Sequence, residues 1–218
     1  MVEDRKQPTG GGTVMAARIL PLVGVTLFFG VGIVWRAWLQ YRRHGHTGIT
    51  LFRSGSRVQW IGEGGFCLIL LAIVAQPVVF AVSPEALSWM QIIAPAPWVV
   101  WVGTLVLVAG VIFMVAAQLG MGASWRVGID EEAAPGLVTG GLYCFCRNPI
   151  YLGMFVALAG MALALPTVLS VVNLLCVVAG VRYQVSQEEE YLLRTYGQSF
   201  RTYASRVGRF LPGLGKMA

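Results

Sequence analysis

The chain has 218 residues, of which 56% are hydrophobic and only 12% are charged, and its mean hydropathy is +0.70. These values lie outside the range of soluble globular domains and indicate an integral membrane protein. The net charge of +6 is modest and the basic residues are scattered around apolar blocks, which disfavours nucleic-acid binding and suggests that they set the membrane topology.

The first apolar block follows a polar N-terminal stretch. Residues 1–18 combine charged residues with glycine, proline and threonine, and they predict a flexible tail. Residues 19–40 are long enough to cross a bilayer core, which requires about 20 apolar residues in a helix. The block ends in aromatic and basic residues that are typical of a membrane interface: Trp35, Trp38, Tyr41, Arg42 and Arg43.

Four further helices are expected after this block. Residues 61–82 and 97–119 each form an unbroken apolar span. The stretch 149–185 is too long for one span, and Pro166 interrupts it, so it predicts two helices of about 16 to 18 residues. The fold class is therefore an all-α integral membrane helical bundle with about five transmembrane helices.

Three regions follow from this division: a tail at 1–18, the first two transmembrane helices at 19–96, and the remaining helices with their loop and C-terminal tail at 97–218. Within the third predicted span, small residues recur every seven positions and predict a close contact between helices: Gly103, Gly110 and Ala117.

The loops predict the orientation. Residues 41–57 and the tail after Arg182 are rich in arginine, whereas residues 83–96 contain no Lys or Arg. The positive-inside rule therefore places the first loop, the 120–148 loop and the C-terminal tail in the cytoplasm. The two most polar segments of the chain then meet on one side of the membrane, where a functional site is expected.

The sequence "GLYCFCRNPIYLG" (141–153) begins the fourth predicted span. Asn148 is a good N-cap residue and Pro149 suits the first helical turn. A helix start favours anions, and the planar guanidinium of Arg147 suits a carboxylate or phosphate. The alternative is that Arg147 anchors to lipid headgroups while the tyrosines form an interfacial belt. The two cysteines are too few for a structural zinc site, so no metal is expected.

A second group of polar residues lies in the C-terminal tail. Residues 187–206 predict an amphipathic helix or helix pair along the membrane surface. Glu188, Glu189 and Glu190 stand close to the end of the fifth span, where acids are unfavourable beside anionic headgroups unless they hold a cation. An arginine suited to an anion and acids suited to a cation together favour a zwitterionic ligand.

The pattern "GLYCFCRNPIYLG", an apolar hairpin, "EE", and then "YGQSFRTYASRVGRFLP" resembles the isoprenylcysteine carboxyl methyltransferase and phospholipid methyltransferase superfamily of membrane enzymes. The resemblance covers roughly residues 97–212. It implies a cytoplasmic pocket for S-adenosylmethionine and transfer of a methyl group to a small or lipophilic acceptor: a carboxylate, an amine or a thiol. Membrane lipids are the other expected partners.

The resemblance also implies site residues. The family's Arg-His-Pro motif falls on Arg147, Asn148 and Pro149. Its neighbouring positions fall on Gly141, Tyr143, Tyr151 and Gly153, and its paired glutamates on Glu188 and Glu189. The cofactor carboxylate would contact Arg147, and its ammonium would contact Glu188 or Glu189. Leu137, Tyr143 and Tyr196 would line the adenine slot. The family histidine is replaced by Asn148, which cannot carry a proton, and no catalytic base is nominated.

Two other functions remain open at this stage. Membrane sterol or enone reductases that use NADPH share a similar Arg-His-Pro-x-Tyr-x-Gly motif, although more basic residues would be expected for the 2′-phosphate. A non-catalytic membrane accessory protein would pair Arg147 with the glutamates, and in that case reversing both charges together would restore folding.

Overall fold

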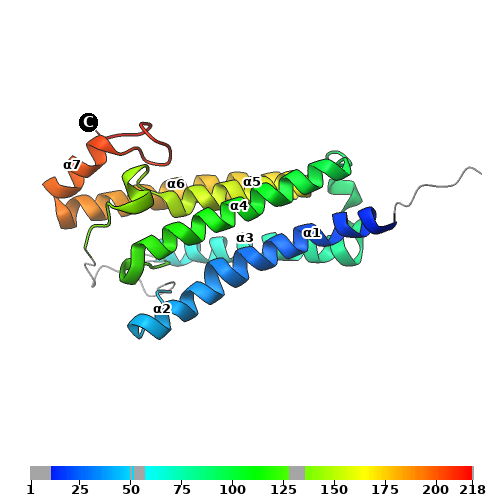
Figure 1. Ribbon diagram of the computed structural model, residues 1–218, viewed down its shortest axis with the longest axis horizontal. Helices are drawn as coiled ribbons and strands as arrows, with labels where there is room; N and C mark the ends of the chain where they lie inside the picture. The colour runs from blue at the N-terminus through cyan, green and yellow to red at the C-terminus, as the bar shows by residue number, and fades with distance from the viewer. Residues whose placement is uncertain (1–10, 50, 52–56, 128–135, 218) are drawn as a thin grey trace, which may run out of the picture.

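The computed structural model describes residues 11–49, 51, 57–127 and 136–217, which form helices without a β-strand (Figure 1). The long helices are α1 (Gly11–Phe29), which continues through the π-helix η1 (Gly30–Trp35) into α2 (Arg36–His44), then α3 (Arg57–Val82), α4 (Pro97–Met121), α5 (Pro149–Ala164), α6 (Val168–Tyr196) and α7 (Gln198–Arg206). Short 3₁₀ turns are η2 (Pro84–Met90), η3 (Gly122–Ser124) and η4 (Gly141–Cys144). The all-α prediction is confirmed. The predicted tail is helical from Gly11 onward, and the rest of it lies outside the described residues.

Among the described residues, four segments are long and apolar enough to cross a membrane: Arg18–His44, Trp60–Val82, Pro97–Ser124 and Val168–Tyr196. The fourth predicted span corresponds to α5, which is apolar but has only 16 residues. Pro166 separates α5 from α6, as predicted, because a proline has no N–H for the helical ladder.

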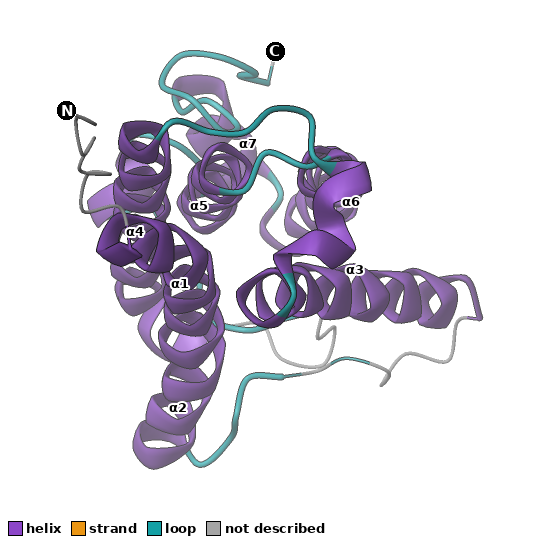
Figure 2. Ribbon diagram, turned by 90° about the vertical axis from the view of Figure 1, so that its right-hand side faces the viewer, coloured by secondary structure: helices purple, strands orange, loops and turns teal. Residues whose placement is uncertain are grey.

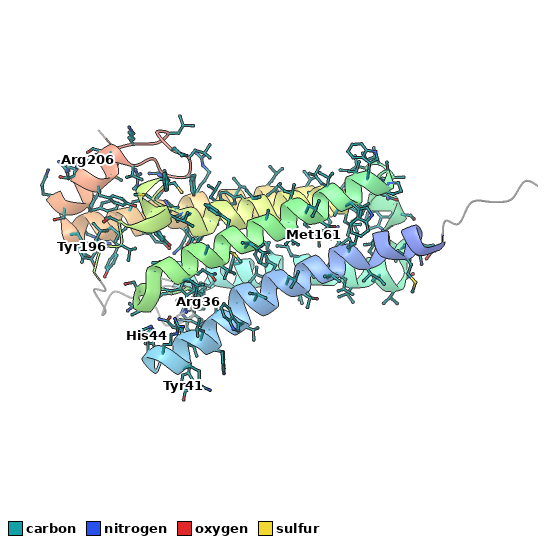
Figure 3. All side chains as sticks on the ribbon, viewed as in Figure 1. Arg36, Tyr41, His44, Met161, Tyr196 and Arg206 are labelled. Carbon is teal, nitrogen blue, oxygen red and sulfur yellow. The ribbon has the colours of Figure 1, made fainter. Side chains whose placement is uncertain are left out.

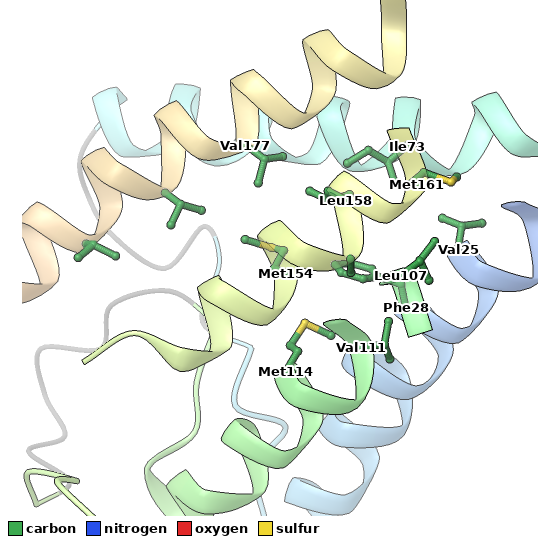
Figure 4. Close-up of a cluster of buried hydrophobic side chains, with 13 residues drawn as sticks. Val25, Phe28, Ile73, Leu107, Val111, Met114, Met154, Leu158, Met161 and Val177 are labelled. Atoms are coloured by element: carbon green, nitrogen blue, oxygen red, sulfur yellow. The ribbon is translucent and has the colours of Figure 1, made fainter. Parts of the chain in front are cut away.

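The four long apolar helices and α5 form a closed ring in the order α1, α3, α6, α5 and α4, which is visible when the bundle is viewed along its length (Figure 2). Each helix contributes apolar side chains to one central cluster (Figure 4). Its members include Val25, Ile73, Leu107, Met154, Leu158, Met161 and Val177. Helix α5 therefore lies between α4 and α6, and its polar N-terminus is brought beside both.

The α4–α5 contact is the most extensive in the bundle, and glycines on both helices make it close. A Cβ atom on Gly110 would lie 2.3 Å from the backbone nitrogen of Ala157, and one on Gly160 would lie 2.3 Å from that of Leu107. Gly103 and Gly153 are equally confined. The contact predicted from the seven-residue spacing is confirmed, since only residues without a Cβ permit this approach.

The loops separate into two ends as the charge pattern predicts. At one end the Val127 amide donates to the Gly48 carbonyl at 2.8 Å, and at the other the Ile92 amide donates to the Pro166 carbonyl at 3.0 Å. Arg36 lies at the same end of the bundle as Tyr196 and Arg206 (Figure 3). Its buried guanidinium donates to the carbonyls of Gln118 and Gly122 at 3.3 and 3.0 Å, where the α4 dipole favours a cation.

Helix α6 differs from the prediction at its C-terminal end. We expected the fifth span to end near residue 185 and a separate amphipathic helix to follow. Instead, α6 continues without a break to Tyr196, because no glycine or proline occurs after Gly180 until Gly197, which has φ +51°. The glutamates therefore stand on the rigid extension of a membrane helix.

Candidate functional site

The 3₁₀ turn η4 lies between the end of α4 and helix α7. Tyr143 is buried, and its hydroxyl donates to the Ala117 carbonyl of α4 at 3.4 Å. The Tyr143 carbonyl accepts a hydrogen bond from the Tyr203 hydroxyl of α7 at 2.6 Å. Gly141 has φ +61°, a conformation that glycine adopts without strain, and it starts the turn. These contacts place the loop before α5 directly against the tail.

Residues 207–217, which we call the C-terminal arm, run back from α7 to the start of α5. The backbone amides of Arg147 and Asn148 donate to the carbonyls of Gly208 and Arg209 at 2.9 and 3.1 Å. The Asn148 side chain donates to the same Arg209 carbonyl at 3.0 Å and does not cap α5. Asn148 occupies the predicted N-cap position, but its side chain binds the arm because that carbonyl lies within reach.

Arg147 is buried and uses all five of its N–H donors inside the chain. Its Nε and Nη2 atoms donate to Oε1 of Glu189 at 3.0 and 2.6 Å. Its Nη1 atom donates to the carbonyls of Ala204 and Val207, and Nη2 also donates to the Gly215 carbonyl at 3.1 Å. A guanidinium has five N–H groups, so none remains for another acceptor. Arg147 therefore ties α6, α7 and the C-terminal arm to the start of α5.

Glu189 joins two arginines. Its Oε1 atom accepts from Arg147 and its Oε2 atom from Arg209 of the C-terminal arm. The side chains of Arg147 and Glu189 are only 3% and 5% exposed, whereas that of Arg209 is 34% exposed. We call these three residues the clamp. A buried charge requires such a partner, because the desolvation of either ion alone costs several kcal/mol.

Glu188 faces a different set of groups from its neighbour. It is half-buried, and its Oε1 atom accepts from the Tyr151 hydroxyl at 2.9 Å and from the Gln184 side chain at 3.2 Å. No described residue donates to its Oε2 atom. Glu188 thus has spare capacity to accept hydrogen bonds, one helix position away from the saturated Glu189.

The tyrosine and cysteine side chains that are buried in the loop and in α7 are neutral near physiological pH. Burial raises the pKa of the Tyr203 hydroxyl to about 12, although the Arg147 charge acts in the opposite direction. Burial likewise raises the pKa of Tyr143 and of the Cys146 thiol. Both tyrosines are therefore hydrogen-bond donors, and Cys146 is a protonated, apolar thiol.

The structure brings together most of the residues singled out from the sequence. Arg147, Asn148, Pro149, Tyr151, Glu188 and Glu189 meet where α5, α6 and the tail converge, with Gly141 and Tyr143 next to them. Leu137 and Tyr196 are half-buried at the same end. The pairing of Arg147 with Glu189 differs from the expected arrangement, in which they face opposite charges of one ligand.

Sequence reasoning missed Arg209, Tyr203 and Gln184. The tail contains several arginines at similar spacings, among them Arg201, Arg206 and Arg209, and no local signal distinguishes the one that turns inward. The arm folds back and places Arg209 next to Glu189, which lies twenty residues earlier in the chain, so Arg209 is the arginine that turns inward.

Comparisons with known proteins find similarity to methyltransferases. The profile of the phospholipid methyltransferase family matches residues 98–199. Protein-S-isoprenylcysteine O-methyltransferase of Dictyostelium discoideum is 28% identical over 117 residues, which are 52% of this chain and 49% of that protein. The Mus musculus protein of the same name is 30% identical over 131 residues, which are 59% of this chain and 46% of that protein. The chain thus spans about half the length of these relatives.

The fold is also shared with a solved structure of the eukaryotic intramembrane Ras methyltransferase, isoprenylcysteine carboxyl methyltransferase. The two align with a TM-score of 0.55 and 19% sequence identity over 95% of this chain and 75% of the other. The matched region contains the whole predicted motif from Gly141 to Glu189. Through this region the chain is similar to the phospholipid methyltransferase family and to the protein-S-isoprenylcysteine O-methyltransferases, and its apolar helices indicate a multi-pass membrane protein.

Proposed function

We propose that this protein is a membrane-embedded methyltransferase that uses S-adenosylmethionine and methylates a small or lipophilic acceptor at the cytoplasmic face. The observation that carries the proposal is the convergence of the family's motif residues. Arg147 of the loop before α5, Tyr151 of α5, and Glu188 and Glu189 of α6 meet in one polar cluster at the end of an apolar bundle. The basic loops at this end support its cytoplasmic placement.

The polar groups of the cluster fit the cofactor unequally. S-adenosylmethionine would supply a methyl group activated on a sulfonium, beside an ammonium, a carboxylate and an adenosine. Glu188 suits the ammonium or a ribose hydroxyl, because its carboxyl group has an Oε2 atom that accepts no hydrogen bond from the described residues. Tyr151 holds the Glu188 carboxylate in place, and Leu137, Gly141 and Tyr143 provide the adjoining surface for the adenosine.

Arg147 and Glu189 take a different role in this proposal. Every N–H of Arg147 already has an acceptor, so a cofactor carboxylate would contact it only by displacing a backbone carbonyl of the tail. We therefore assign Arg147, Asn148, Pro149 and Glu189 to holding the C-terminal arm over the site, which excludes water from it. Arg147 shapes the cofactor site through the chain that it binds.

The proposed methyl transfer requires little general acid or base catalysis. Methyl transfer from a sulfonium is an in-line displacement in which the acceptor atom forms a bond to the methyl carbon as the carbon–sulfur bond breaks. Alignment of the two reactants in such a step contributes about 7 kcal/mol or more. Residues that bind, orient and exclude water are therefore sufficient when the acceptor reaches the site deprotonated. The relatives are named for S-isoprenylcysteine, which supports a carboxylate on a lipophilic molecule as the first acceptor to test.

Binding of S-adenosylhomocysteine to the purified protein in lipid nanodiscs tests the proposal. We expect calorimetry to detect binding to the wild-type protein and a weaker affinity for Glu188→Gln. Glu190→Gln is the matched control, because Glu190 is the exposed neighbouring acid of the same helix. Absence of binding to the wild-type protein would overturn the cofactor assignment. Equal affinities of the Glu188 and Glu190 variants would overturn the site assignment. Mass spectrometry of membrane extracts supplied with isotope-labelled cofactor would then identify the acceptor.

The same titration separates the other two functions. A reductase would bind NADPH in place of S-adenosylhomocysteine, and a non-catalytic accessory protein would bind neither. The Arg147–Glu189 ion pair is the arrangement expected for the accessory protein. The superfamily match favours the methyltransferase, because it includes both members of that pair.

A further inference from the structure

Helix α5 is short compared with the membrane that it would cross. Its 16 residues extend about 24 Å at a rise of about 1.5 Å per residue, whereas a bilayer hydrocarbon core is about 30 Å thick. Both ends of α5 therefore lie at or inside the boundary of the hydrocarbon. Residues packed against its first turns share that depth.

The C-terminal arm packs against these turns. Its backbone pairs with residues 146–148, and the ring of Phe210 lies 5.5 Å from that of Phe155, centroid to centroid. Phe155 is six positions after Pro149, which is about 9 Å along the helix. The arm thus follows α5 toward the middle of the membrane, and Figure 1 shows it folding back from α7 along the bundle.

The outer surface of the arm carries exposed leucines and the exposed Lys216, next to the basic residues of α7. Leu211 and Leu214 are 47% and 64% exposed. Residues 198–218 contain Arg201, Arg206, Arg209 and Lys216 and no acidic residue. Apolar tips surrounded by cations are typical of segments that lie in the interface of an anionic leaflet.

We propose that the C-terminal arm is a re-entrant segment that inserts Leu211 and Leu214 into the lipid of the surrounding membrane, with the bilayer as the partner of this surface. Irregular backbone at that depth requires internal hydrogen-bond partners, because lipid offers none. Arg147 donates to the carbonyls of Val207 and Gly215, and the Arg209 and Leu214 amides donate to the carbonyls of Leu214 and Leu211, so part of the arm backbone has internal partners. The inference goes beyond the proposed activity and does not depend on it.

Fluorescence quenching at single cysteines tests the insertion. We would replace Cys67, Cys144, Cys146 and Cys176 by alanine, introduce Leu214→Cys or Ser205→Cys, and label each with bimane. The proteins would be reconstituted in vesicles of phosphatidylcholine and phosphatidylglycerol. Ser205 is the control because it is exposed on α7, outside the arm.

Insertion predicts several-fold stronger quenching of the Leu214 label by nitroxide lipids than of the Ser205 label, and the reverse order with aqueous iodide. Equal iodide quenching at both positions would overturn the proposal. Weak quenching of the Leu214 label by both reagents would also overturn it, since that result places a second copy or another protein on the arm.

A wild-type experiment keeps the test independent of the cysteine variants. Photoactivated diazirine lipids should form adducts on the peptide that contains residues 207–217, detectable by mass spectrometry. Leu68 of α3 serves as the positive control, because it is 68% exposed on a membrane-spanning helix. Adducts on the Leu68 peptide without adducts on the arm would contradict insertion.

Discussion

Replacing Glu189 by glutamine removes the carboxylate that contacts both arginines of the clamp. Arg147 is 7% exposed and keeps three carbonyl acceptors, but it loses its counter-charge. Removing one partner of a buried ion pair costs about 3–5 kcal/mol. Arg209 adds little to this cost, because its side chain is 34% exposed and such pairs are worth about 1 kcal/mol or less.

The adjacent glutamate provides a matched comparison. Glu188→Gln retains an oxygen that can accept from Tyr151 and Gln184, which are neutral donors, so we expect a loss below about 1.5 kcal/mol. For a chain of this size about 1 kcal/mol shifts Tm by about 2–4 °C. We therefore expect Tm to fall by about 6–20 °C for Glu189→Gln and by no more than about 6 °C for Glu188→Gln.

Thermal unfolding of each purified variant in the same detergent, followed by the fluorescence of the seven tryptophans, measures the difference. Equal Tm values for the two variants would refute the conclusion that Glu189, and not Glu188, stabilises the protein through its ion pairs. The double reversal Arg147→Glu with Glu189→Arg should not restore Tm. A glutamate at 147 would face the carbonyls of Ala204, Val207 and Gly215, which accept hydrogen bonds and repel a carboxylate.

Two further predictions concern packing and thiol reactivity. Gly110→Ala should destabilise the protein by about 1–3 kcal/mol, because its Cβ would lie 2.3 Å from the Ala157 nitrogen. Gly180→Ala, where no atom lies within 4 Å, should not, and equal Tm values for these two variants would contradict the close α4–α5 contact. In a protein lacking Cys67 and Cys176, maleimide at neutral pH should modify Cys144, which is exposed, much faster than Cys146, which is 2% exposed. Burial raises the Cys146 pKa and lowers its thiolate fraction, so equal rates would show that the loop opens in solution.

Much of this architecture could be predicted from local patterns in the sequence. Apolar length indicated the membrane helices, Pro166 the break between α5 and α6, and the seven-residue spacing of Gly103 and Gly110 the closest helix contact. These features depend on residues near one another in the chain, so composition and periodicity reveal them. The motif around Arg147 likewise indicated the superfamily and the end of the bundle where the polar residues gather.

Only the tertiary structure decided which charges meet. Glu188 and Glu189 are neighbours in sequence, yet the roughly 100° turn between adjacent helical residues directs one toward Tyr151 and the other toward Arg147 and Arg209. The sequence predicted a ligand for Arg147, whereas the fold supplies Glu189 and the carbonyls of residues 204, 207 and 215. Those acceptors lie up to 68 positions away. They reach Arg147 because the tail folds back beside the start of α5, where a buried cation must find its partners within the protein.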